Sequence, residues 1–193
     1  MAIVAQIRDL FRLTRSQGIA RRYFITNGFD GALTMLGLTM GFYVSGGVAP
    51  AIAVSACAGA AIALGMSGVT SAYVSEAAER RRELRDLQGA MVADLGESTH
   101  ARAARLVPFL IAFVNGFAPL VISAVVILPL WLAAMGVGLP GDPLELAIGL
   151  AFAMIFLLGV FLGRISGTFW LWTGLRTVLI GLVTASIILV LDI

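Results

Sequence analysis

Five apolar stretches of about 20 residues each limit what this 193-residue chain can fold into. A helix of that length crosses the roughly 30 Å hydrocarbon core of a bilayer. Only 12% of the residues are charged, against about 25% in an average soluble domain. We therefore predict an all-α integral membrane protein with five transmembrane helices. The predicted spans are about Tyr23–Ser45, Ala49–Tyr73, Leu106–Met135, Leu144–Gly163 and Phe169–Leu191.

The segments around these spans complete the predicted organisation. Residues 1–22 alternate arginine with apolar residues and predict an amphipathic helix lying at the membrane surface. Residues 23–73 hold the first two spans, 74–105 form a charged helical segment, and 106–193 hold the last three spans. Turns are predicted at Gly46-Gly47 and between Gly138 and Pro143.

The basic residues, all of them arginine, predict the orientation of the chain. They fall before the first span, between the second and third, and around the start of the fifth. With five spans, these regions share one side of the membrane. Because arginine and lysine accumulate on the cytoplasmic side, we expect the N-terminus in the cytoplasm and the C-terminus outside the cell or in the lumen of an organelle.

Asp30 is the one acidic residue deep in a predicted span, within the stretch TNGFDGALT. An ionised side chain at such depth costs about 2.5–3.5 kcal/mol on insertion scales, so intramembrane acids usually have a function. Asn27 and Thr34 lie three residues before and four after it, on the same helical face. Amide, carboxylate and hydroxyl oxygens are ligands for divalent cations. The alternative is a packing role for Asp30 against a neighbouring helix.

Two further intramembrane residues are candidate metal ligands. The thioether of Met66 would favour a transition metal over magnesium or calcium, although methionine is also an ordinary apolar filler. Asn115 in the third span either faces the same pathway or bonds a neighbouring helix.

A stripe of acids follows the second span and continues it as a helix beyond the membrane. Glu76, Glu79 and Glu83 fall on one helical face, and carboxylates on adjacent turns can chelate a cation. The alternative is a solvated helix with ion pairs such as Glu76–Arg80 and Glu79–Arg82. A second acidic group, Asp94, Glu97 and His100, lies farther along the same segment.

Several classes of protein are excluded by missing motifs. The chain has no GxxxxGK[ST] phosphate loop, no CxxC and no HExxH, and its one histidine lies outside the spans. We therefore expect no enzymatic activity, no resident cofactor and no nucleic-acid partner.

The chain from Arg21 to Ile193 resembles the vacuolar iron transporter family, closest to its short prokaryotic members. The resemblance rests on DGALT in the first span, on a methionine-containing second span leading into YVSEAAERRREL, on the proline-containing third span and on the IG-rich fifth span. It implies a five-span homodimer that moves Fe²⁺, often also Mn²⁺, out of the cytoplasm in exchange for protons. The likeness to the prokaryotic members also implies a location in the plasma membrane of a prokaryote. The family's span-one acid corresponds to Asp30.

The chain also departs from the family pattern. Met66 lies seven residues before Tyr73, where the family methionine usually lies about five before, and Ala72 stands where an acid is often found. The expected function is divalent-metal export by proton antiport. The alternative is a non-transporting membrane scaffold or subunit whose arginine-rich cytoplasmic face holds a partner or anionic lipid.

Overall fold

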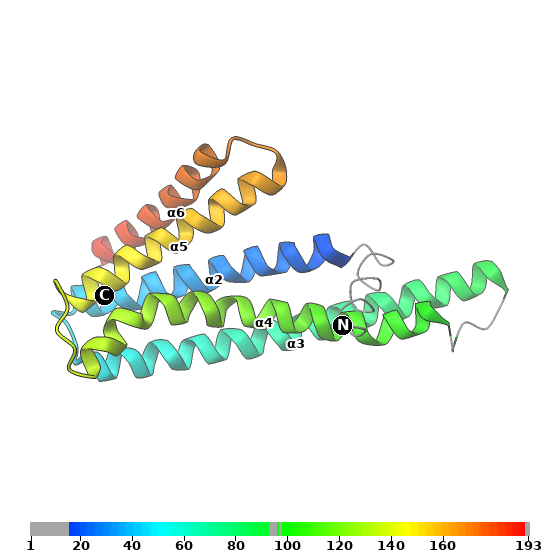
Figure 1. Ribbon diagram of the computed structural model, residues 1–193, viewed down its shortest axis with the longest axis horizontal. Coiled ribbons are helices and arrows are strands. Elements are labelled where there is room, and N and C mark those ends of the chain that lie inside the picture. The colour runs from blue at the N-terminus through cyan, green and yellow to red at the C-terminus, as the bar shows by residue number, and fades with distance from the viewer. Residues whose placement is uncertain (1–15, 93–95, 97, 192–193) are drawn as a thin grey trace. The chain divides into compact units, whose positions relative to one another are not determined.

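The computed structural model describes residues 16–92, 96 and 98–191, and these residues fold into helices connected by turns. The prediction of an all-α protein is confirmed for this part of the chain. The helices are α2 (Ser16–Val44), α3 (Pro50–Met91), α4 (Thr99–Ala134), α5 (Pro143–Ser166) and α6 (Trp170–Leu191) (Figure 1).

Four of these helices, α3 to α6, are long and apolar enough to cross a membrane. They indicate an integral membrane protein. The first predicted span, Tyr23–Ser45, lies in α2, which is 29 residues long but does not reach the same apolar composition. The reason is local, because Asn27 and Asp30 lie within its apolar stretch and arginines precede it. Length and composition therefore identify four candidate spans among the described residues, and the span predicted in α2 is not confirmed.

The turns between helices lie where glycine and proline predicted them. Gly46 and Gly47 have φ of 87° and 86°, a backbone region that glycine adopts without strain, and they separate α2 from α3. The side chain of Asp142 accepts hydrogen bonds from the backbone N–H groups of Leu144 and Glu145 and so caps α5. Asp142 thus has a structural role at this turn.

The helices extend beyond the predicted spans. Helix α2 runs unbroken across the predicted boundary between residues 22 and 23, while the rest of the predicted amphipathic segment lies outside the described residues. Helix α3 continues from its apolar part to Met91, as the acidic stripe predicted. Helix α4 begins at Thr99, before the predicted third span, and continues through Pro108, Pro119 and Pro129.

The chain divides into two compact units. The first contains the chain up to Phe24 together with Gly65–Phe117, and the second contains Ile25–Leu64 together with Ala118–Ile193. In the first unit, the start of α2 packs on the start of α4. This contact joins Ile19, Ala20 and Tyr23 to a core of Ala103, Val107 and Ile111.

Close glycine contacts join α3 to α4 inside the first unit. A Cβ atom added at Gly116 would lie 2.5 Å from the carbonyl oxygen of Gly65, and one at Gly68 would lie 3.2 Å from the Cα of Gly116. The side chain of Asn115 donates a 2.7 Å hydrogen bond to the carbonyl oxygen of Gly68. Small residues therefore let these two backbones approach each other, as in other membrane helix pairs.

In the second unit, α5 and α6 form an antiparallel hairpin (Figure 1). A Cβ atom added at Gly159 would lie 2.9 Å from the Cα of Gly174, and one at Gly163 would lie 2.9 Å from the Cα of Trp170. The hydroxyl of Thr177 donates to the carbonyl oxygen of Ile155. The glycine pair Gly159/Gly163 thus serves packing within the chain.

We expect the Gly116→Ala substitution to destabilise the protein by about 2 kcal/mol, because overpacking of this kind typically costs about 1–3 kcal/mol. The added methyl group would push α4 away from Gly65 and strain the bond between Asn115 and Gly68. Thermal unfolding in detergent measures the effect. The matched control is Gly149→Ala in α5, where no atom lies within 4 Å of the added Cβ. Equal unfolding temperatures for the two variants would contradict the close contact.

Candidate metal site

The face of α2 that carries Asp30 is the strongest candidate for a metal site. The helix is continuous through TNGFDGALT, so Asn27, Asp30 and Thr34 lie on one face, as predicted. Asp30 is exposed in the single chain, and its two neighbours are partly exposed. The three oxygen-bearing side chains are therefore accessible together.

Another side of the same helix is closely packed. A Cβ atom added at Gly31 would lie 2.9 Å from the Cα of Pro119 in α4, and one at Gly28 would lie 3.1 Å from a methyl group of Leu158 in α5. At Gly31 the backbones of α2 and α4 therefore approach closely, and α2 remains a continuous helix there. This packing fixes the rotation of α2 and keeps the Asp30 face turned away from Pro119 and Leu158.

The Asp30 face continues toward the end of α2 as a glycine pair. Gly37 and Gly41 are seven and eleven residues after Asp30, so they lie on the same helical face. A Cβ atom added at either glycine would meet no other atom within 4 Å. The sequence showed this GxxxG pair but not its face. Unlike the pair in α5, it is left open by its own chain.

The other two intramembrane candidates belong to the first compact unit. Met66 is 61% exposed, since Gly65 and Gly68 on either side of it carry the contact with α4. Asn115 is buried, and its amide nitrogen bonds the carbonyl oxygen of Gly68. This hydrogen bond supports the alternative interpretation, in which Asn115 bonds a neighbouring helix.

Arg80 pairs with two carboxylates of the acidic stripe on α3. Arg80 donates to Glu83 at 2.7 Å and lies 3.9 Å from Glu76, so the predicted Glu76–Arg80 pair is confirmed. The predicted Glu79–Arg82 pair is wrong, because Arg82 lies 4.0 Å from Asp86 instead. Glu79 is exposed. Two of the three carboxylates proposed to chelate a cation thus face a guanidinium.

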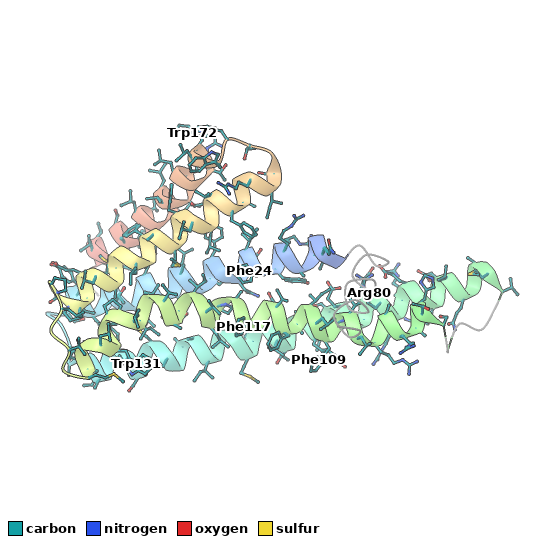
Figure 2. The ribbon with its side chains drawn as sticks, viewed as in Figure 1. Phe24, Arg80, Phe109, Phe117, Trp131 and Trp172 are labelled. Atoms are coloured by element: carbon teal, nitrogen blue, oxygen red, sulfur yellow. The ribbon has the colours of Figure 1, made fainter. Side chains whose placement is uncertain are left out.

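Glu76 and Arg80 form a buried ion pair three residues beyond the apolar part of α3 (Figure 2). Burial raises the pKa of the Glu76 carboxyl, while the positive charge of Arg80 opposes that rise. Tyr23 from the start of α2 hydrogen-bonds the same carboxylate, and Arg22 adds a second positive charge nearby. The sequence predicted the pair but not its burial, which depends on the packing of α2 and α4 around it.

No group of three or more histidine, cysteine, aspartate or glutamate side chains that could hold a metal ion occurs among the described residues. Asp94 and Glu97 of the second acidic group lie outside them. His100 lines a hollow of about 240 Å³ together with Arg80 and Glu83. A metal site built from one copy of the described chain would therefore depend on amide, hydroxyl or thioether ligands beside a carboxylate.

Comparisons with known proteins add one relative. The chain is 28% identical over 160 residues to the uncharacterized protein MJ0645 of Methanocaldococcus jannaschii, which covers 81% of this chain and 80% of that protein. No family model matches the chain. No solved structure matches it.

Proposed function

We propose that this protein is a divalent transition-metal transporter that exports Fe²⁺ or Mn²⁺ from the cytoplasm in exchange for protons. The observation that carries the proposal is Asp30, an acid within the apolar part of α2 whose helical face also carries Asn27 and Thr34. In this proposal α2 is the fifth membrane span. A carboxylate placed at membrane depth is costly unless it has a function.

The proposed transporter is a homodimer. Asp30 is exposed in the single chain, and an exposed carboxylate facing hydrocarbon is unfavourable. The open glycine pair Gly37/Gly41 on the same face is the type of surface on which two membrane helices associate. Pairing of the α2 helices from two copies would cover both features and bring two Asp30 carboxylates together. A particle with the mass of a single chain would contradict this part of the proposal.

Metal and proton would compete for the same carboxylate. Asp30 binds the cation as an anion, with Asn27 and Thr34 on the same helical face as candidate co-ligands, and releases it when it takes a proton. Exposed Glu79, and Glu83 where it is not held by Arg80, would attract cations to the entrance. Competition at a single site is the simplest mechanism that couples export of metal to import of protons.

The experiment that tests the function is transport by the purified protein in liposomes. Accumulation of Fe²⁺ or Mn²⁺ that rises with an imposed pH gradient, and that an ionophore collapsing the gradient abolishes, is expected. Calcium and magnesium serve as control ions. Liposomes that accumulate no more metal than protein-free liposomes would overturn the proposal.

The alternative is a non-transporting scaffold whose arginine-rich end holds a partner or anionic lipid. One observation favours it, which is that Arg80 faces two of the three carboxylates of the acidic stripe. Calorimetric titration of the purified protein with Mn²⁺ separates the two functions. The scaffold predicts no binding heat, whereas the transporter predicts saturable binding.

A further inference from the structure

Two adjoining hollows lie on the surface formed by α3 and α4. The first, the apolar groove, has a volume of about 320 Å³ and is lined by Val69, Thr70, Tyr73, Phe109, Ala112 and Phe113. The second, the basic hollow, has a similar volume and contains Arg81 and Arg105 among its lining residues. Tyr73 lines both, so the two hollows meet at its ring.

The apolar groove lies on a helix that is long and apolar enough to span a membrane. Phe113 and Phe109, the latter labelled in Figure 2, are nevertheless 60% and 67% exposed. The rings of Tyr73 and Phe109 meet edge to face, with their centroids 6.5 Å apart. Tyr73 thus lies where the groove meets the basic hollow, and tyrosine is enriched at the membrane interface.

Within the described part of the chain, no carboxylate lines the basic hollow or pairs with its arginines. Among the described residues, Arg80 and Arg82 on α3 have acidic partners, whereas Arg81 and Arg105 are in no ion pair. Arg105 donates from Nε to the carbonyl oxygen of Ala101 and from Nη2 to that of Gly96. These bonds hold its guanidinium in position at the hollow. The hollow therefore fits a group that brings negative charge.

The spacing of the two hollows along the helices matches a phospholipid. Arg105 is four residues from Phe109 and eight from Phe113, which corresponds to about 6 Å and about 12 Å along α4. The headgroup layer on each side of a bilayer is about 5–7 Å thick. A phosphate held at Arg105 thus places the acyl chain of the same molecule beside Phe109 and Phe113.

We propose that the basic hollow and the apolar groove together bind one anionic phospholipid, its phosphate between Arg81 and Arg105 and an acyl chain along Tyr73, Phe109 and Phe113. Basic pockets at the ends of membrane helices are known to bind anionic headgroups. The site is built by α3, α4 and their connection, and its lining residues do not include Asp30 or the other residues of the proposed metal pathway.

The proposal is tested with phosphatidylglycerol and phosphatidylcholine that carry the same acyl chains. Native mass spectrometry of the detergent-purified full chain counts the lipid molecules that each chain retains. We expect phosphatidylglycerol to bind at least about tenfold more tightly than phosphatidylcholine, since each basic residue near the surface favours anionic lipid. Equal retention of the two lipids would show only bulk lipid on an apolar surface and would overturn the proposal.

Two double variants that remove the same number of positive charges test where the lipid binds. The double substitution Arg81→Gln with Arg105→Gln is expected to abolish the preference for phosphatidylglycerol. The control Arg82→Gln with Arg85→Gln removes the same charge from α3 outside the hollow and is expected to keep it. Equal losses in both would indicate a general surface charge effect and contradict the site. If the first variant does not fold, the proposal is still tested by comparing the retention of the two lipids on the unsubstituted chain.

The acyl part is tested separately with glycerol phosphate, the headgroup without its chains. We expect millimolar glycerol phosphate to leave bound phosphatidylglycerol in place, and Phe109→Ala with Phe113→Ala to weaken its retention. Displacement by glycerol phosphate, or full retention by the phenylalanine variant, would reduce the site to a simple anion site and overturn the proposal.

Discussion

Replacing Asp30 with asparagine is expected to slow metal transport at least about 100-fold, since even groups that only orient a metal ligand contribute about 10- to 100-fold. Asparagine keeps the size and hydrogen-bonding shape of the side chain. It removes the negative charge that binds the cation and the group that would carry the proton. Uptake of radioactive Mn²⁺ into proteoliposomes under a pH gradient measures the effect.

The matched control for this experiment is Asp142→Asn. Asp142 caps α5 through its side-chain oxygen, and asparagine caps helices equally well. Transport and stability of this variant are expected to remain unchanged. Both variants should elute from a sizing column at the position of the unsubstituted protein. Transport by Asp30→Asn at the control rate would remove Asp30 from the pathway and with it the proposed mechanism.

The helices and turns were predictable because their causes are local. Continuous apolar runs of membrane-spanning length predicted α3 to α6, and Gly46-Gly47 and the residues before Pro143 predicted two of the turns. The face shared by Asn27, Asp30 and Thr34 follows from the helical period alone. The same composition argument does not extend to α2, where Asn27 and Asp30 lower the apolar content.

The partners of each helical face were not predictable, because they depend on contacts between residues distant in the chain. The GxxxG pairs in α2 and α5 look alike in sequence. In the structure, Gly159 and Gly163 pack against α6, whereas a Cβ atom added at Gly37 would meet no neighbouring atom within 4 Å. Only the position of α6 distinguishes them.

The interactions of the acidic stripe on α3 were also only partly predictable from the sequence. Spacing along α3 allows either cation chelation or ion pairs. The structure brings Tyr23 and the start of α4 against Glu76 and Arg80, and so converts one pair of a solvated helix into a buried pair. The helical period gives no signal for this burial, although a pair close to the end of an apolar run is where it would be expected.

Substituting Arg80 with glutamine is expected to destabilise the protein by about 3 kcal/mol, because removal of one partner from a buried ion pair leaves the other charge uncompensated. Glu76 is the charge left behind, since Glu83 is half exposed and can be solvated. The matched control is Arg82→Gln, two residues farther along α3, whose pair with Asp86 is exposed at both ends. Such surface pairs contribute about 0–1 kcal/mol. Thermal unfolding in detergent compares the two.

The pH dependence of the Arg80→Gln variant identifies the responsible group. Burial already raises the pKa of Glu76, and loss of Arg80, which opposes that rise, raises it further. The folded state then holds the Glu76 proton more tightly than the unfolded state, so the free energy of unfolding decreases as pH rises through the folded pKa. The loss in free energy of unfolding of Arg80→Gln, relative to the unsubstituted protein, is therefore expected to be smaller at pH 5 than at pH 8. Adding Glu76→Gln should restore most of the stability and abolish this dependence, whereas a deficit that persists unchanged in the double variant would show that Arg80 acts through packing rather than through charge.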